Sequence, residues 1–232
     1  MGTSTFQFKQ FTIRQDRCAM KVGTDAVLLG AWVRTATASR VLDVGTGTGL
    51  VALMLAQRST ATIDALEIDA DAAQQARENV LDSPWNNRVR IVAADARTWS
   101  EAPYDLIVSN PPFFRQSLKA PSPNRSLARH DDTLTWEQLV DLAGRQLTSD
   151  GRFALILPIE SEGVFEALCW QRGLYLLRQC AVSTRMGAPP KRLLMEFSRN
   201  QGLVEYSTLT LHTVNLQRTE AFSILTADFY LC

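Results

Sequence analysis

The sequence predicts an α/β protein in which a mostly parallel sheet carries helices on both faces. From residue 40 onward, short apolar runs alternate with helical segments, a pattern typical of right-handed β-α-β units. Two apolar runs, within residues 96–110 and 152–158, suit strands buried on both faces. A glycine-rich turn follows the first predicted strand. In such sheets ligands bind beyond the carboxyl ends of the strands, so a site is expected there.

The predicted elements follow from local patterns. A short N-terminal hairpin is expected where four apolar residues nearly alternate: Phe6, Phe8, Phe11 and Ile13. The next helix is expected to run through Val33, with Thr24 or Asp25 as its N-cap. The sheet is expected to have seven strands: Arg40–Val44, Thr62–Glu67, Val89–Ala93, Tyr104–Ser109, Arg152–Leu157, Leu176–Ser183 and Leu193–Arg199. The helices expected among them are Gly49–Arg58, Ala70–Val80, Trp136–Leu147 and Glu162–Gln171, and a last strand is expected at Thr208–Thr213.

The chain of 232 residues is expected to form one domain, because a single α/β domain reaches this size. Residues 1–38 would be an N-terminal extension with the hairpin and first helix. Residues 39–200 would be the core, and 201–232 a C-terminal strand and helix. Residues 110–133 hold four prolines and no clear periodicity, so a long functional or disordered loop is expected there.

Charge and composition exclude several classes of protein. Lys and Arg number 24 and so do Asp and Glu, which excludes a globally basic nucleic-acid coat and a highly charged disordered tail. The cations are 20 Arg and 4 Lys, and Arg suits bidentate contact with phosphate. With no long apolar run and no signal peptide, we expect a cytoplasmic protein without a membrane span. The four cysteines lack C-x-x-C spacing, so no metal site is expected.

The glycine-rich turn is the first candidate binding site. It reads Asp43-Val44-Gly45-Thr46-Gly47-Thr48-Gly49. Glycine permits positive φ and lets backbone approach a ligand. The dinucleotide pattern G-x-G-x-x-G fails, because the sixth position from Gly45 is Leu50.

Acidic residues follow the next two strands. Glu67 ends the second strand, where a carboxylate can accept both hydroxyls of a ribose. Asp69 is expected to be the N-cap of the following helix. Asp95 and Ala96 follow the third strand.

The turn, with Asp43 before it, resembles the first motif of class I S-adenosylmethionine-dependent methyltransferases. The resemblance implies a Rossmann-like fold with S-adenosylmethionine as cofactor. It implies that Asp43, Gly45, Gly47, Gly49 and Glu67 belong to the cofactor site. It also implies that Asp95, beside Ala96, accepts a hydrogen bond from the adenine amino group of the cofactor.

The most specific chemical signal is Asn110-Pro111-Pro112-Phe113, directly after the fourth strand. It resembles the (N/D)PP(Y/F) motif of methyltransferases that modify exocyclic amines and amides. Such a nitrogen is a poor nucleophile, because its lone pair is delocalised. The Asn110 oxygen and the Pro111 carbonyl can accept hydrogen bonds from the two N–H groups of this nitrogen and so localise its lone pair. The consecutive prolines fix the backbone. Phe113 can stack on the target ring, and Asn110 is expected to border the cofactor as well.

Several alternatives remain open for the substrate. Glutamine methyltransferases of release factors usually carry NPPY and an N-terminal helical domain, which this chain lacks room for. Guanine-N2 methyltransferases of ribosomal RNA often carry NPPF but are duplicated or longer. DNA adenine methyltransferases usually carry a separate target-recognition domain. A non-catalytic RNA reader is disfavoured by the intact Asn110 and glycine turn, and by the absence of zinc-finger, homeodomain or RRM signatures.

Nearly the whole chain resembles the bacterial tRNA1(Val) adenine-N6 methyltransferase family. The segments that carry the resemblance are 11–32, 110–114, 128–130, 189–193 and 220–231, the last of which resembles a closing helix. Membership implies methylation of adenine 37, 3′ of the anticodon. It also implies that Lys21, Thr24 and Asp25 line the methionine end of the cofactor pocket, where Lys21 can pair with the cofactor carboxylate.

Two basic stretches are expected to contact the tRNA anticodon stem-loop, since phosphate contacts supply much of nucleic-acid affinity. The first, after Phe113, contains no acid; its cations are Arg115, Lys119, Arg125 and Arg129. The second runs from Arg172 to Arg199 and includes Lys191 and Arg192. No role is assigned to His130 or His212, and the oligomeric state is not predicted.

Overall fold

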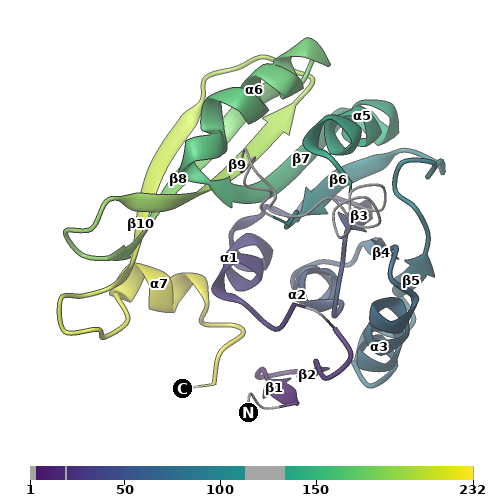
Figure 1. The fold of residues 1–232 in the computed structure, drawn as a ribbon, viewed down its shortest axis with the longest axis horizontal. Coiled ribbons are helices and arrows are strands. Elements are labelled where there is room, and N and C mark those ends of the chain that lie inside the picture. The colour runs from purple at the N-terminus through teal and green to yellow at the C-terminus, as the bar shows by residue number, and fades with distance from the viewer. Residues whose placement is uncertain (1–3, 19, 113–133, 232) are drawn as a thin grey trace, which may run out of the picture.

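One mixed sheet organises the computed structural model, which describes residues 4–18, 20–112 and 134–231 (Figure 1). Its strands follow the order β10-β8-β9-β7-β6-β3-β4-β5. The strands are β3 (Arg40–Val44), β4 (Thr62–Glu67), β5 (Val89–Ala93), β6 (Tyr104–Ser109), β7 (Leu147–Pro158), β8 (Tyr175–Arg185), β9 (Pro190–Ser198) and β10 (Glu205–His212). Within the described sheet, β9 alone runs antiparallel to its neighbours.

The sheet has eight strands rather than the seven expected. The strand predicted in the C-terminal segment joins the same sheet as β10, parallel to β8. Because β9 is antiparallel, it ends at the edge of the sheet where β10 begins, so a short connection is enough. Leu209 and Leu211 of β10 are buried, and their burial holds the extra strand in register.

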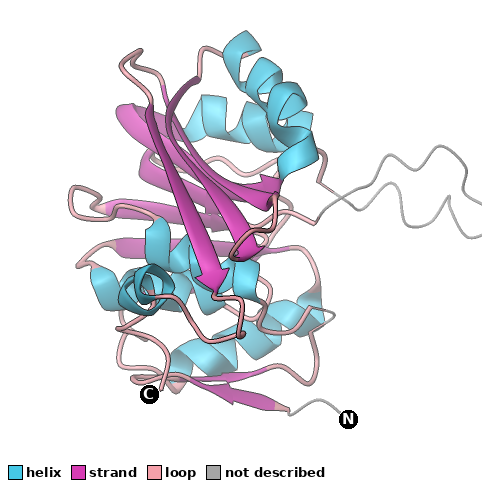
Figure 2. Ribbon diagram, turned by 90° about the vertical axis from the view of Figure 1, so that its left-hand side faces the viewer, coloured by secondary structure: helices cyan, strands magenta, loops and turns pink. Residues whose placement is uncertain are grey.

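Helices cover both faces of the sheet, as predicted. They are α1 (Thr24–Trp32), α2 (Leu50–Arg58), α3 (Ala70–Leu81), α5 (Trp136–Gln146), α6 (Glu162–Gln171) and α7 (Glu220–Leu225), with a 3-10 turn η1 at Ile159–Ser161. One core cluster lies under α1, α2, α3 and α7, and a second lies under α5 and α6. Figure 2 shows these two groups of helices on either side of the strands.

The predicted cap of α1 is wrong. The N-cap is Gly23, and it makes no side-chain cap bond. Thr24 is exposed, and the Asp25 carboxylate instead accepts a 2.8 Å bond from Arg192 Nε. A long-range ion pair has therefore replaced the local cap. By contrast, Asp69 caps α3 as expected, accepting a bond from the Ala72 N–H.

The N-terminal hairpin, β1 (Thr5–Gln7) and β2 (Thr12–Arg14), forms as predicted. Two buried amides of α3 fix the chain that leaves it. Asn79 accepts from the Arg14 N–H (2.8 Å) and donates to the Arg14 carbonyl (3.0 Å). Gln75 accepts from the Arg17 N–H (3.1 Å) and donates to Asp16 (2.8 Å). Asn79 also donates to the Thr48 carbonyl (2.9 Å), so the extension and the glycine turn share one anchor.

The end of the chain packs against the same hairpin. The Lys9 N–H donates to the Phe229 carbonyl (2.8 Å), and the Phe8 ring stacks on Tyr230. Both ends therefore meet beside α2 and α3 (Figure 1). No helix in the described ranges is long and apolar enough to cross a membrane.

Candidate active site

The carboxyl ends of four parallel strands bring the predicted site together. Val44 of β3 is in register with Ser109 of β6 on one side and with Leu66 of β4 on the other. Glu67 is in register with Ala93 of β5. The glycine turn, Glu67, Asp95 and Asn110 therefore follow neighbouring strands at a single edge of the sheet.

The glycine turn has a backbone that glycine alone adopts easily. Gly45, Gly47 and Gly49 have φ angles of +73°, +56° and +82°, in the left-handed region. A Cβ on Gly45 or Gly47 would meet nothing within 4 Å, whereas one on Gly49 would lie 3.5 Å from Ala76 Cβ. The first two glycines thus leave open space in front of the turn. The third packs on α3 and is the N-cap of α2.

Asp43 lies behind the turn and is only 1% exposed. Its Oδ2 accepts from the Thr46 hydroxyl (2.6 Å) and from the Ala52 N–H (3.2 Å). Burial raises the pKa of Asp43 to about 7. In this structure Asp43 braces the turn from its buried side.

Glu67 is held in place by backbone donors. Its Oε2 accepts from the Gly47 N–H (2.8 Å) and its Oε1 from the Asp69 N–H (3.0 Å). Each carboxylate oxygen keeps a second acceptor site. The side chain is half-buried and borders a cavity of about 60 Å³. This geometry leaves two oriented acceptors for a pair of hydroxyls.

Asp95 and Ala96 line the same cavity, with Ile68 and Leu134 as apolar neighbours. The Asp95 carboxylate is paired with Arg97: Nε lies 2.9 and 2.8 Å from its two oxygens, and Nη2 lies 2.6 Å from Oδ2. This contact holds the pKa of Asp95 below its usual value. Arg97 was not predicted, although its position two residues after Asp95 is the signal that would have indicated it.

Asn110 lies at the end of β6 with its acceptor unused. Its Oδ1 is buried and has no hydrogen-bond partner among the described residues. Pro111 is buried beside it, and Pro112 is exposed. The preceding Ser109 donates its hydroxyl to the Val44 carbonyl (2.9 Å), which joins β6 to β3 immediately before the motif. Phe113 lies outside the described residues.

The segment before α1 forms another side of the site. Lys21 is exposed and has no acidic partner within the described ranges. Arg192, the third residue of β9, is in register with Pro158, the last residue of β7. Since β7 and β6 are parallel, the Asp25–Arg192 ion pair lies at the same edge as Asn110. A predicted cofactor residue and a predicted RNA residue are thus bound to each other.

The structure describes the second of the two basic stretches but not the cations of the first. Arg115, Lys119, Arg125 and Arg129 lie outside the described residues. In the second stretch, three arginines are engaged within the protein: Arg172 with Asp141, Arg178 with Glu196, and Arg199 with the Gly144 carbonyl. Arg172 precedes β8 and Arg199 follows the antiparallel β9, so both lie at the opposite edge of the sheet. Arg172 and Arg199 therefore lie away from the candidate site, whereas Lys191 lies at the edge that carries it.

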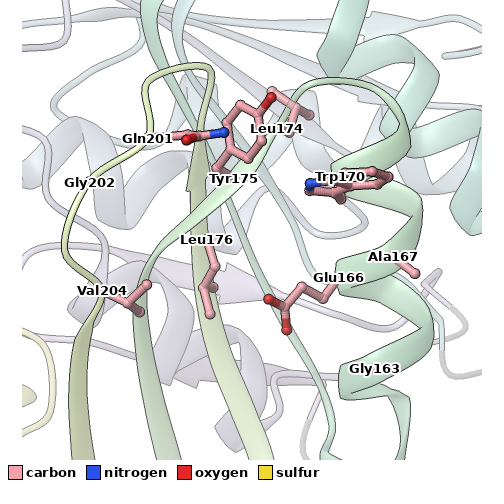
Figure 3. Close-up of a pocket in the computed structure, with 10 residues that line it drawn as sticks. All are labelled: Gly163, Glu166, Ala167, Trp170, Leu174, Tyr175, Leu176, Gln201, Gly202 and Val204. Atoms are coloured by element: carbon pink, nitrogen blue, oxygen red, sulfur yellow. The ribbon is translucent and has the colours of Figure 1, made fainter.

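A larger cavity of about 540 Å³ lies elsewhere, between α6, the start of β8 and the connection to β10 (Figure 3). Trp170, Tyr175 and Gln201 point toward it, and none of the predicted site residues lines it. It belongs to the amino-terminal edge of β8. We therefore place the candidate active site at the edge of the sheet that carries the smaller cavity, which is lined by Gly45, Glu67, Asp95 and Ala96 among the predicted residues.

Comparisons with known proteins identify the family to which the chain is similar. The family model of the methyltransferase small domain matches residues 18–162. The chain is 46% identical to the tRNA1(Val) (adenine(37)-N6)-methyltransferase of Bacteroides fragilis, which covers 100% of this chain and 99% of that protein. The enzymes of the same name from Tolumonas auensis and Cronobacter sakazakii are 46% and 43% identical, covering 100% and 97% of this chain and 98% and 94% of theirs.

Solved structures of methyltransferases share the fold. A predicted O-methyltransferase from Agrobacterium tumefaciens has a TM-score of 0.68 at 22% identity, covering 88% of this chain and 96% of that one. The 16S rRNA N2 G1207 methyltransferase of T. thermophilus, solved with AdoMet and guanosine, has a TM-score of 0.58 at 19% identity, covering 84% and 50%. The Rossmann-like class I methyltransferase fold is confirmed.

Proposed function

Because the chain belongs to the tRNA1(Val) (adenine(37)-N6)-methyltransferase family, we propose that it methylates N6 of adenine 37, 3′ of the anticodon, in tRNA1(Val). The cofactor is S-adenosylmethionine, and the reaction takes place in the cytoplasm. One observation carries the proposal: the buried Asn110 Oδ1 lacks a partner among the described residues. An unpaired buried acceptor costs stability, and a substrate amine would supply the missing donor.

The residues at the strand ends fit the cofactor. Gly45 and Gly47 leave open space in front of the turn, Glu67 presents two oriented acceptors to a ribose, and Ile68 and Leu134 border a cavity suited to an adenine ring. When bound, S-adenosylmethionine supplies an electrophilic methyl group on a sulfonium sulfur. Thr24, Lys21 and the Asp25–Arg192 pair would border its methionine end.

Asn110 and Pro111 act on the target nitrogen. The Asn110 Oδ1 and the Pro111 carbonyl accept hydrogen bonds from the two N–H groups of adenine N6. These bonds draw the nitrogen toward tetrahedral geometry and localise its lone pair. Two consecutive prolines restrict the backbone that carries these acceptors. Phe113 would stack on the adenine ring. Acceptors aligned in advance reduce the reorganisation needed in the transition state.

The proton lost from N6 needs no strong base. A methylated aminium is acidic, whereas an amide oxygen and a backbone carbonyl are very weak bases. The proton on N6 is therefore released to water and is not transferred to the Asn110 or Pro111 oxygen. The chemistry then depends on acceptor placement rather than on a titrating catalytic side chain.

The test is methyl transfer from radiolabelled S-adenosylmethionine to purified tRNA1(Val), followed by mass spectrometry of the digested nucleosides. We expect N6-methyladenosine at position 37, and a matched transcript with guanosine at that position should remain unlabelled. Loss of this modification in tRNA from a deletion strain would add independent support. Methylated guanine or protein glutamine in place of N6-methyladenosine would overturn the proposal.

A further inference from the structure

Strand register brings three basic side chains side by side at the far end of the sheet. Arg185, the last residue of β8, is in register with His212, the last residue of β10. His212 in turn forms an isolated antiparallel bridge with Arg218. The His212 ring and the Arg218 guanidinium both lie near Phe222, at 6.0 and 5.8 Å. We refer to Arg185, His212 and Arg218 as the basic row.

The two arginines of this row are available to a partner. Both are exposed, and neither has an acidic partner within the part of the chain that the structure describes. Arg218 lies instead over the Tyr230 ring at 4.3 Å. The segments 179–195 and 206–219 that surround the row contain no Asp or Glu. In a chain of zero net charge, this is a local positive surface.

The basic row lies at the same edge as the active site but not within it. β8 and β10 are parallel to β6 in direction, so their carboxyl ends lie at the edge that carries Asn110. β8 is three strands from β6 and β10 is four, a lateral offset of about 14 to 19 Å at the usual strand spacing of about 4.8 Å. The register places Gln179 level with Ser109, so Arg185 lies six residues further along its strand, and the row lies about 20 to 25 Å from Asn110 at about 3.3 Å per residue. A ligand that reaches both places must span this distance, as a polynucleotide can.

Exposed apolar residues accompany the row. Met186 follows Arg185 and is 54% exposed, and Leu216 precedes Arg218 and is 70% exposed. Leu216 has a φ of +61°, in a region that a leucine adopts only at a cost. Backbone bonds between Thr213 and Gln217 (2.8 Å) and between Leu216 and Thr213 (3.1 Å) hold this turn. An apolar side chain is thus fixed toward solvent beside the cations.

We infer that the basic row is a second RNA-binding surface, which takes backbone phosphates of the tRNA anticodon stem while adenine 37 occupies the Asn110 site. The inference rests on the proposed function. Arg185 and Arg218 bind the phosphates, and His212 positions the row by donating from its Nδ1–H to the Thr184 carbonyl, 3.1 Å away. Leu216 and Met186 contact sugar edges. The active site selects the base, and the row adds affinity for the stem.

The test compares wild type with the Arg185→Ala/Arg218→Ala double variant, using full-length protein, tRNA1(Val) and a series of salt concentrations. We expect KM for tRNA to rise about tenfold near physiological salt, and the slope of log affinity against log salt to fall by about 1.5 to 2, as for the loss of two phosphate contacts. Cofactor affinity and kcat should stay within twofold. A short anticodon-loop oligonucleotide without the stem should be methylated equally by both proteins.

Controls separate the inference from general charge effects and from misfolding. Arg14→Ala/Arg172→Ala removes the same charge at sites away from this edge, and it should leave the salt slope unchanged. Because Arg218 packs on Tyr230, Arg185→Glu alone serves as a second variant that preserves this packing. If wild type methylates tRNA1(Val) but both row variants keep its KM and salt slope, the inference is overturned. If wild type fails to methylate tRNA1(Val), the proposed function itself fails.

Discussion

The two sides of the candidate active site differ in whether their acceptor atoms already have hydrogen-bond partners. On the β3–β4 side, Asp43 and Glu67 each accept two bonds from the glycine turn and its neighbours before any ligand arrives. On the β6 side, the Asn110 oxygen is buried and has no partner among the described residues. In the proposed reaction, the first arrangement would orient an acceptor for the cofactor. The second would reserve an acceptor for the nitrogen that reacts.

The largest effect on activity is expected from a substitution of Asn110, on the β6 side of the site. Asn110→Ala should lower kcat by about 100- to 1000-fold, as for loss of a preorganised transition-state partner. Cofactor affinity should stay within about twofold, because the turn and Glu67 are untouched. Single-turnover kinetics and cofactor titration of the same preparation measure the two quantities. Equal loss of both would show that Asn110 belongs to the cofactor side instead.

Glu67→Ala should do the reverse. Losing two hydrogen bonds to a charged acceptor should weaken cofactor binding about 100- to 10,000-fold, since each such bond is worth about 1.5–3 kcal/mol. With saturating cofactor, kcat should recover to within a few-fold of wild type. Glu67→Gln is the matched control, because it keeps one oxygen acceptor in the same shape. An unchanged dissociation constant in the alanine variant would contradict the ribose assignment.

A third test concerns the buried carboxyl behind the turn. The pKa of Asp43 is raised to about 7, so between about pH 4 and 7 the folded protein keeps a proton that the unfolded chain has lost. The free energy of unfolding should therefore fall as pH rises through this window, by up to about 1.4 kcal/mol per pH unit from this group. Asp43→Asn can keep both bonds at one oxygen and removes this contribution. Urea unfolding of both proteins from pH 5 to 7 measures the contribution of Asp43 to the free energy of unfolding. Parallel pH profiles of the two proteins would contradict the prediction.

The smallest effect is expected at Lys21. An exposed lysine that pairs with the cofactor carboxylate should contribute about 0.2–1 kcal/mol, so Lys21→Ala should weaken cofactor binding by up to about fivefold. Decarboxylated S-adenosylmethionine provides the comparison, because it lacks the group that Lys21 would bind. Its affinity should be the same for wild type and variant. A loss of affinity for both ligands would reveal an indirect role.

Most of the core could be predicted because its signals are local. The bounds of β3, β4, β5, β6 and α6 match the sequence prediction, since each is an apolar or periodic run that ends at glycine or polar residues. The start of β7 was missed, because Thr148–Gly151 reads as a turn, yet Leu147 pairs with Tyr104 of β6. The predicted cap at Thr24 or Asp25 was wrong, since the N-cap is Gly23 and Asp25 instead binds Arg192, which is distant in sequence.

The site divides in the same way. The glycine turn and Asn110 directly follow strands and Glu67 ends one, so spacing alone brings them to one edge. The pairing of Arg97 with Asp95 is also local, and the spacing of two residues could have indicated it. The basic row depends on register between strands from three separate segments, and no local pattern encodes it. Partners distant in sequence are what the structure adds.

The amides of Gln75 and Asn79 set a rule for engineering this protein. They are 0% and 2% exposed, and their bonds go mainly to residues 14–17. Deleting the first two dozen residues would strand both amides, at about 1–3 kcal/mol for each unsatisfied buried group, and would disturb Thr48 through Asn79. A shortened chain should therefore carry apolar replacements at both positions, and a graft of the extension onto another methyltransferase should bring both amides with it.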